Sequence, residues 1–295
     1  MNNEMLKSMT NGCYQLQKLR IQHGNRVVAN FRAKLGIKAG QKTETVEGDD
    51  EKKILKIVTL AYEKITEGVV KVSKRAKFNY DGTISSYAEL ILVDGYMKLL
   101  QNEQDQFGQL KNIVSEFPIW KHFLKDVRGC GPAIAAVIIS EFDIHKAKYA
   151  SSLHKYAGLD VVLVQTENGE TVGEGRSRKK AHLEDAEYTD RHGEKKVKKG
   201  ITFNPFLKTK LAGVLGGSFL KSKSEYSEVY YNYKHRISND PRHKEKTKIH
   251  LHNMANRYML KVFLNDLYAK WREIEGLEVY PPYHEAKLGM KHTGS

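Results

Sequence analysis

A polar segment at residues 167–200 carries the densest positive charge of the chain and is therefore a candidate site for binding phosphate groups. Its basic residues form two runs, which are Arg176, Arg178, Lys179 and Lys180, then Lys195, Lys196, Lys198 and Lys199. The segment has too little apolar surface to form a core, so we expect a mobile loop or a small hairpin. Long basic loops commonly bind phosphate, and we interpret both runs as nucleic-acid contacts. A solvated surface insertion is the alternative.

A turn at residues 127–133, which reads VRGCGPA, is the second candidate. Glycine tolerates positive φ and the close approach of another backbone, as a tight turn between helices requires. Pro132 suits the first turn of the following helix, where free amide groups can hold a phosphate. The pattern predicts a helix-hairpin-helix that binds nucleic-acid backbone through Arg128, Gly129 and Gly131. A hairpin whose glycines only allow two helices to pack is the alternative.

Tyrosines and basic residues alternate at residues 226–236, and this pattern is typical of single-stranded or looped nucleic-acid binding. Tyrosines at helical spacing also fit a core. We therefore interpret only Lys234 and Arg236 as nucleic-acid contacts in this stretch. Lys208 and Lys248, on the two neighbouring helical segments, complete the predicted contacts.

The sequence contains no pattern typical of a metal site, a cofactor site or a membrane segment. Cys13 and Cys130 provide neither a disulfide framework nor zinc spacing. His250 and His252 are two residues apart, which places them on different faces of a helix, so we interpret them as surface or phosphate contacts. The most apolar run, residues 133–139, is too short to cross a bilayer, and the N-terminus lacks a signal-peptide pattern. We expect a cytoplasmic protein without metal or cofactor.

The chain has 295 residues with 49 Lys and Arg against 35 Asp and Glu, a formal charge of +14. This excess favours a polyanionic partner. Apolar spacing predicts a helix at residues 3–35 with a kink or break at Gly24 and Asn25, a linker to residue 50, and an amphipathic helix from Ile54 to Val72. A turn signal at residues 78–82 precedes a second long helix, where Ser86 and Glu89 have capping-box spacing. The two helices are expected to form an antiparallel arm.

The predicted fold class is mainly α. We expect an N-terminal helix and linker (1–50), a coiled-coil arm (51–116), a Nop-like nucleic-acid-binding domain (117–280) and an extended tail (281–295). Within the third region, residues 161–165 form a β-like run, Asn204 and Pro205 begin a helix, and a last helix covers residues 244–275. Glycines at 213, 216 and 217 predict close approach of another helix or of nucleic acid.

Several segments resemble, in order, the C-terminal half of the DEDD-type insertion-sequence transposases, which are guided by a bridge RNA. These are the helical arm, GCGP at 129–132, YAGL at 156–159, NPFLK at 204–208, and residues 230–234 and 248–271. The arm and domain are also similar to the Nop domain of box C/D ribonucleoproteins and to Tas proteins of tandem-interspaced-guide-RNA systems. The resemblance covers most of the chain after about residue 51 and implies RNA-guided binding.

The first 50 residues depart from the transposase pattern. DEDD transposases carry an N-terminal RuvC-like domain whose acidic residues hold divalent metal, whereas residues 1–50 offer no converging carboxylates. The family's second catalytic element is a serine after the YAGL segment. The resemblance assigns that position to Ser177, which could act as a nucleophile or only donate a hydrogen bond to a phosphate. We expect the hydrogen-bonding role, because no base is evident beside Ser177, although His182 is the nearest candidate along the chain.

The leading hypothesis is an RNA-guided nucleic-acid-binding protein without its own RuvC-like nuclease. It would bind a guide RNA, target DNA and act as a homodimer through its arm. The first alternative is a DEDD-type transposase or recombinase that uses the loop serine. The second is a basic helical protein that binds nucleic acid non-specifically or has a structural role.

Overall fold

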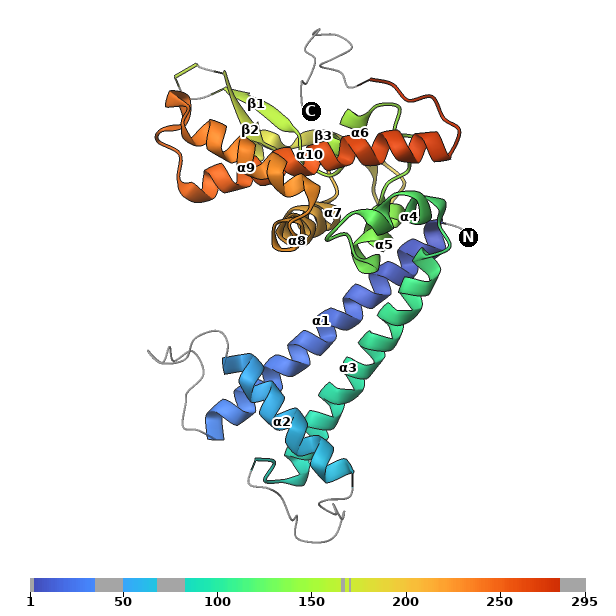
Figure 1. Cartoon of the computed structure of the whole chain (residues 1–295), viewed down its shortest axis with the longest axis vertical. Helices are drawn as coiled ribbons and strands as arrows, with labels where there is room; N and C mark the ends of the chain where they lie inside the picture. The colour runs from blue at the N-terminus through green and yellow to red at the C-terminus, as the bar shows by residue number, and fades with distance from the viewer. Residues whose placement is uncertain (1–2, 35–49, 68–82, 166–167, 170, 282–295) are drawn as a thin grey trace. The chain divides into compact units, whose positions relative to one another are not determined.

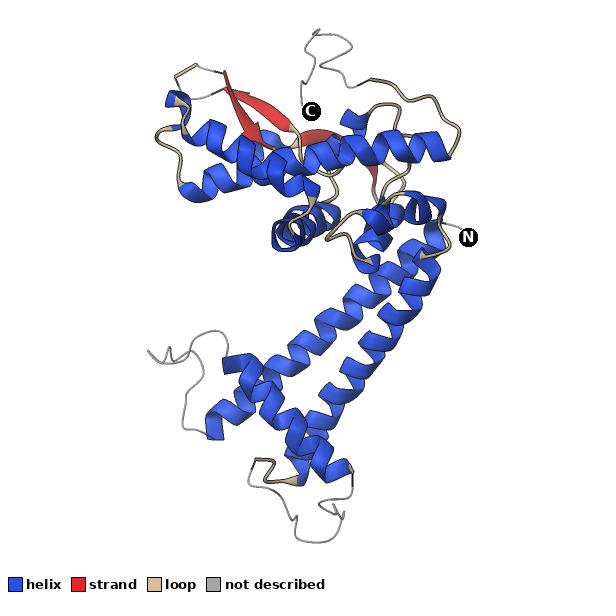
Figure 2. Ribbon diagram, in the orientation of Figure 1, coloured by secondary structure: helices blue, strands red, loops and turns tan. Residues whose placement is uncertain are grey.

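The computed structural model describes residues 3–34, 50–67, 83–165, 168–169 and 171–281, and these are mainly helical, as the sequence predicts (Figure 2). The chain divides into two compact units, one of residues 8–110 and one of residues 1–7 with 111–295. None of the described helices combines the length and apolar character needed to cross a membrane.

Three helices build the unit of residues 8–110: α1 (Asn3–Lys34), α2 (Asp50–Thr66) and α3 (Tyr87–Val114) (Figure 1). Side-chain contacts show that α1 and α3 are antiparallel, because the residue numbers of the partners on α3 decrease as the residue numbers on α1 increase. These contacts are Arg20 with Glu103 at 2.6 Å, His23 with the Leu92 carbonyl at 2.8 Å, and Asn30 with Glu89 at 3.2 Å. The predicted boundary at residue 50 therefore does not separate α1 from α2 and α3. Val27, Val58 and Val93, one from each helix, are buried in a shared core.

Of the predicted kink or break at Gly24, the break does not occur, since α1 is continuous. A Cβ at Gly24 would lie 3.0 Å from the Tyr96 ring, so this glycine serves close packing on α3. The capping spacing is confirmed, because the Glu89 amide donates to Ser86 Oγ at 3.2 Å and the Glu89 carboxylate accepts from the Ser85 amide at 2.6 Å. The predicted linker after α1, the turn at 78–82 and the tail beyond residue 281 lie outside the described residues.

The larger unit contains seven further α-helices among its described residues. They are α4 (Pro118–His122), α5 (Pro132–Glu141), α6 (Ala150–Tyr156), α7 (Pro205–Lys208), α8 (Gly216–Ser222), α9 (Glu225–Ser238) and α10 (Lys248–Ile274). Helices α9 and α10 lie side by side (Figure 1). Helix α10 begins at Lys248 instead of the predicted 244, because the Thr247 side chain caps it by accepting from the His250 amide at 3.2 Å.

The last eight residues of helix α5 are buried. The predicted turn before it exists, with Gly129 at φ +89° and Pro132 at the first helical position. The element on the other side of the turn is short, however, consisting of α4 and a 3-10 turn at Leu124–Asp126. Ser218 of α8 donates to the Gly129 carbonyl at 2.8 Å, so the turn packs on α8.

The described residues between 161 and 200 form two antiparallel strand pairs, which matches the expected small-hairpin form of the basic segment. Strand β1 (Val161–Gln165) pairs with β2 (Thr171–Gly175), and β3 (Glu184–Thr189) pairs with β4 (Lys195–Gly200). The registers place Val161 opposite Gly175 and Glu184 opposite Gly200. A 3-10 turn at Lys180–His182 connects β2 to β3.

A π-helical stretch at Thr209–Leu215 separates α7 from α8. Asn256 of α10 donates to the Ala212 carbonyl at 2.9 Å, and a Cβ at Gly216 would collide with the Asn256 side chain. The predicted close helix approach is therefore confirmed at Gly216. The Asn204 side chain caps α7 by accepting from the Leu207 amide at 3.0 Å, as the Asn–Pro pair predicts.

Candidate functional site

Ser177 and His182 meet at the turn between β2 and β3. Strand β2 ends at Gly175, and the 3-10 turn carries the chain back so that His182 faces Ser177. Ser177 Oγ lies 2.9 Å from His182 Nδ1, within hydrogen-bond distance. The expectation that no base lies beside Ser177 therefore needs correction. His182 is five residues away along the chain but contacts Ser177 directly. A serine hydroxyl bonded to an imidazole is the arrangement that activates a nucleophile.

The hydrogen bonds around His182 define which nitrogen carries its proton. The Ser177 backbone amide can only donate, and it lies 3.0 Å from His182 Nδ1, so Nδ1 accepts. The proton of the neutral ring is then on Nε2, and Nδ1 is an acceptor shared by the Ser177 amide and the Ser177 hydroxyl. The imidazole side chain is fully buried, which holds this orientation.

Glu174 lies on the other side of the imidazole. Its Oε2 is 3.4 Å from His182 Nε2, and this nitrogen has no closer hydrogen-bond partner among the residues described. A hydrogen bond from Lys179 lowers the pKa of the Glu174 carboxyl below its ordinary value. Glu174 is therefore ionised at neutral pH and would stabilise an imidazolium at His182.

Arg176, predicted to bind phosphate, is instead buried inside the hairpin region. Its Nε donates to both carboxylate oxygens of Asp160, at 2.9 and 2.8 Å. Its Nη1 donates to Glu184 at 3.0 Å and to Thr202 at 2.6 Å. With the side chain 6 % exposed, this guanidinium anchors both hairpins to the loop before α7 and is not available to a phosphate.

Three cations from other elements lie near this turn, and we call Lys208, Arg257 and Lys261 the cationic cluster. The Lys208 ammonium donates to the Arg176 carbonyl, and a Cβ at Gly175 would collide with the Arg257 guanidinium. Burial lowers the pKa of all three side chains, and Arg257 lowers those of Lys208 and Lys261 further by repulsion. The carboxylate of Asp160 attracts all three cations, but it already binds Arg176. The cluster thus has uncompensated positive charge suited to a phosphate.

Most lysines of the basic segment contact neighbours on the same hairpin. Lys179 pairs with Glu174 at 2.8 Å, Lys199 with Asp185 at 2.9 Å, and Lys198 lies 4.5 Å from the centre of the Tyr188 ring. Lys196 contacts two carboxylates, those of Asp190 at 2.5 Å and Glu194 at 3.0 Å. The exposed Arg178, Lys180 and Lys195 form no ion pair within the described part of the chain. Their role in binding nucleic acid remains a prediction.

The other predicted contacts are distributed over the larger unit. Arg128 and Gly131 are exposed, Gly129 packs on α8, and Lys248 is exposed in the first turn of α10. Lys234 and Arg236 lie over tyrosine rings of α9, 5.4 Å from the Tyr230 centre and 5.0 Å from the Tyr233 centre.

His252 is half-buried and contacts a tyrosine of α9. Its Nδ1 lies 2.6 Å from the Tyr230 hydroxyl, so this histidine joins α9 to α10. Thr247 contacts the backbone amide of His250, whose imidazole stays exposed. The two histidines do not contribute to one site.

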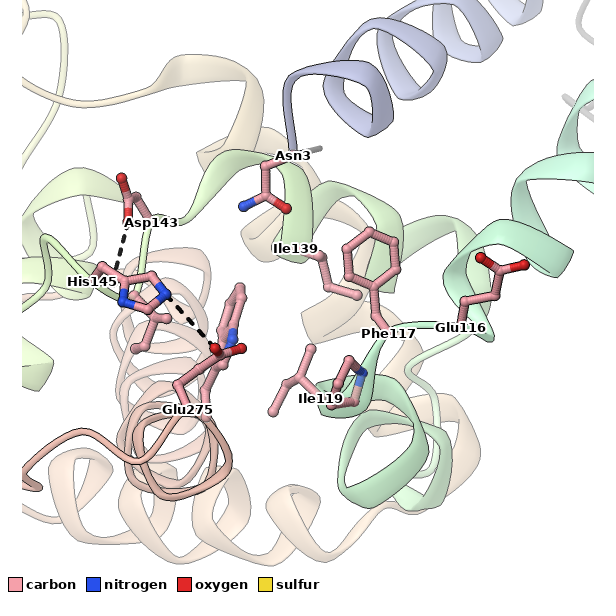
Figure 3. A pocket seen from close by; sticks show the side chains of 11 residues that line it. Asn3, Glu116, Phe117, Ile119, Ile139, Asp143, His145 and Glu275 are labelled. Carbon is pink, nitrogen blue, oxygen red and sulfur yellow. Dashed lines mark hydrogen bonds and ion pairs between the residues drawn. The ribbon is translucent and has the colours of Figure 1, made fainter. Parts of the chain in front are cut away.

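A separate pocket of about 400 Å³ lies beside α4, α5 and the end of α10 (Figure 3). His145 lies between Asp143 and Glu275, with its Nε2 3.7 Å from the Glu275 carboxylate, and Glu116 also lines the pocket. Three acidic side chains make this pocket unsuitable for a phosphate. Across the described residues, no group of three or more His, Cys, Asp or Glu could hold a metal ion.

Comparison with known proteins provides one match. The family model described as the transposase IS116/IS110/IS902 family matches residues 121–185, which include the turn before α5, Glu174, Ser177 and His182. No curated protein and no solved structure matches the chain. The matched segment supports a transposase-like relationship for the part of the chain that carries the candidate site.

Proposed function

We propose that this chain is a transposase-like protein in which Ser177 attacks a phosphodiester bond of DNA. The observation that carries the proposal is the 2.9 Å contact between Ser177 Oγ and His182 Nδ1. The segment that matches the transposase family contains both residues, so the site and the family relationship support each other.

The proposed reaction begins when His182 Nδ1 accepts the Ser177 hydroxyl proton. Ser177 Oγ then forms a bond to phosphorus, and the bond from phosphorus to one sugar oxygen breaks. That oxygen leaves as a hydroxyl after taking up a proton from water. The strand end stays attached to the protein as a phosphoserine ester until another hydroxyl attacks phosphorus and releases Ser177. Glu174 stabilises the charged imidazole while it holds the proton.

The cationic cluster supplies the electrostatic part of the proposal. The negative charge on phosphate oxygens increases as Ser177 attacks, and half-buried cations stabilise such charge better than solvated ones. Arg257 lies against Gly175, and Lys208 binds the carbonyl of Arg176, so both cations lie beside residues next to Ser177 in the chain.

Guide RNA, a DNA target and homodimer formation through the helical arm belong to the same proposal. The net charge of +14 and the exposed Arg178, Lys180 and Lys195 support a nucleic-acid partner. Guidance by RNA rests on the likeness to RNA-guided transposases.

A second candidate function is RNA-guided binding without strand cleavage, in which Ser177 does not react. One observation favours it: the Lys179 amide donates to Ser177 Oγ at 3.3 Å. Together with the Ser177–His182 contact, this bond could simply stabilise the turn. Ser177 would then be a structural residue of the hairpin.

The experiment that separates the two functions is a search for a covalent adduct. The full chain, with the RNA that co-purifies with it, is incubated with matching DNA and magnesium and then denatured. Strand transfer predicts a slowly migrating protein–DNA band that Ser177→Ala abolishes and that His182→Asn weakens by about 100-fold or more. Ser151→Ala, a change at an exposed serine of α6, is the matched control and should leave the band intact.

An adduct equally strong in Ser177→Ala would refute the assignment of the nucleophile. Retention of DNA by the wild type without any adduct would favour the binding function. Circular dichroism of each variant shows whether the fold is preserved.

A further inference from the structure

A pocket of about 920 Å³ lies between α6, α9 and α10, with the segment at residues 279–281 along one side. Its volume is in the range of small-ligand sites. Among its lining residues are Tyr233 and Arg236 of α9, and Tyr258, Lys261 and Asn265 of α10. It is separate from the pocket lined by Glu116 and Asp143, and it combines aromatic rings, cations and an amide.

Two stacked tyrosines form an aromatic platform in this pocket. The Tyr233 and Tyr258 rings have centres 4.2 Å apart and planes inclined by 16°. The Arg236 guanidinium lies over Tyr233, 5.0 Å from its centre. Planar bases stack on tyrosine rings and beneath guanidinium groups, so a base that displaces the Arg236 guanidinium from the Tyr233 ring would stack between the two.

An unsatisfied acceptor marks the same pocket. Asn265 Oδ1 is buried and has no hydrogen-bond partner among the described residues. A buried acceptor without a partner is unfavourable unless a ligand supplies an N–H or O–H group. The exocyclic amino groups of adenine, cytosine and guanine are such donors.

Charge also favours a nucleotide over an uncharged aromatic ligand. Lys261 and Arg236 provide cations for a phosphate, and the one acidic residue among the lining side chains, Asp266, accepts a hydrogen bond from the Tyr226 hydroxyl at 2.9 Å. Burial lowers the pKa of Lys261 below its ordinary value, and repulsion from Arg257 adds to this shift. An anion next to Lys261 would raise this pKa again by attraction and so oppose both effects.

Lys261 and Arg257 connect the pocket to the Ser177 turn. Lys261 lines the pocket and belongs to the cationic cluster. Arg257 interacts electrostatically with Tyr233 and also lies against Gly175, the last residue of β2. A strand whose phosphate lies on the cluster could therefore place a neighbouring base in the pocket.

We propose that the pocket between α6, α9 and α10 binds one unpaired base of a nucleic-acid strand whose phosphate lies on Arg257 and Lys261. The base stacks on the Tyr233–Tyr258 platform, and Asn265 Oδ1 accepts a hydrogen bond from its amino group. The strand is either a DNA strand at the reacting phosphate or a guide RNA, and both present the same base and phosphate chemistry.

The test uses the full-length Ser177→Ala protein, so that binding is measured without strand transfer. Short labelled DNA and RNA strands carry either adenine or an abasic site at one position, and dissociation constants are measured by fluorescence anisotropy. Loss of one base–aromatic stack corresponds to about 5- to 150-fold in affinity. We expect Tyr233→Ala to weaken the adenine strand by a factor in this range and the abasic strand hardly at all. The strand type that shows the difference identifies its source.

Tyr231→Ala is the matched control, since Tyr231 is on the same helix, is 58 % exposed and lies outside the pocket lining. It should bind like the parent protein, and Tyr233→Phe should retain the stack. The parent protein should bind a strand with adenine more tightly than a strand with unsubstituted purine, which lacks the amino group. Asn265→Leu should remove this difference. Equal losses for adenine and abasic strands in Tyr233→Ala would overturn the proposal, as would an unchanged affinity for both strand types. Either result would leave the Ser177 adduct experiment unaffected.

Discussion

Arg176 and Arg178 are the same residue type on either side of Ser177. From the structure we expect substitution of Arg176 to lower stability and substitution of Arg178 to weaken nucleic-acid binding. Arg176→Met keeps the apolar stem of the side chain and removes the bonds to Asp160, Glu184 and Thr202. Removing one partner of a buried ion pair costs about 3–5 kcal/mol. Glu184 is 49 % exposed and regains water, so we expect the lower end of this range, about 3 kcal/mol.

For a chain of this size, each kcal/mol lowers Tm by about 2–4 °C, so Arg176→Met should lower it by about 6–12 °C. Arg178→Met, at an exposed position, should change stability by less than about 0.5 kcal/mol. It should instead reduce the slope of log affinity against log salt by about one.

Thermal unfolding followed by circular dichroism measures the first effect. Anisotropy of a labelled DNA at several salt concentrations measures the second. The reasoning is refuted if Arg176→Met unfolds at the wild-type temperature and lowers the salt slope. In that case Arg176 would be the phosphate ligand that the sequence predicts, and the buried contacts would contribute little.

Three further outcomes follow from the described contacts. Gly129→Ala should destabilise the protein by about 1–3 kcal/mol in urea unfolding, because φ is +89° and a Cβ would lie 2.8 Å from Ser222 Oγ. Gly131→Ala is the control and should be nearly neutral, because there is open space around its Cβ. Burial raises the pKa of the Cys130 thiol from 9.0 to about 12, so Cys130 in the native protein should resist alkylation at pH 9. The stability that the protonated thiol contributes is present below pH 9 and declines as pH rises towards 12. Rapid alkylation of native Cys130, detected by mass spectrometry, would contradict this. Asn204→Ala should lower stability by about 1 kcal/mol through loss of the α7 cap, and an unchanged urea midpoint would show that the cap is dispensable.

Sequence reasoning was most accurate where the determinants are local. The cap at Ser86, the Asn204–Pro205 helix start and the strand at residues 161–165 depend on neighbours within a few positions. It did not distinguish, at Gly24, a glycine that breaks a helix from one that admits a ring from another helix, because both have the same local pattern. The partner, Tyr96, is on α3.

The candidate site was only partly predictable for the same reason. The resemblance identifies Ser177, and the sequence places His182 five residues after it. The 3-10 turn that brings the two side chains together could not be predicted from the sequence. Burial of Arg176 depends on Asp160, Glu184 and Thr202, which belong to three different segments. Arg257 and Lys261 lie in an ordinary amphipathic helix, and nothing in their spacing distinguishes them from solvated cations.

Charge density along the sequence therefore does not predict which cations of this protein are partly desolvated. The lysines of β4 are dense but exposed, and carboxylates such as Asp185 and Asp190 already contact Lys199 and Lys196. A phosphate would have to compete with these carboxylates in solvent, where each contact contributes little. The cationic cluster has fewer charges, but they are partly desolvated and share one nearby carboxylate that already binds Arg176. Because electrostatic attraction is stronger in such surroundings, we expect the cluster to select where the strand lies and the exposed hairpin charges to increase the rate of encounter.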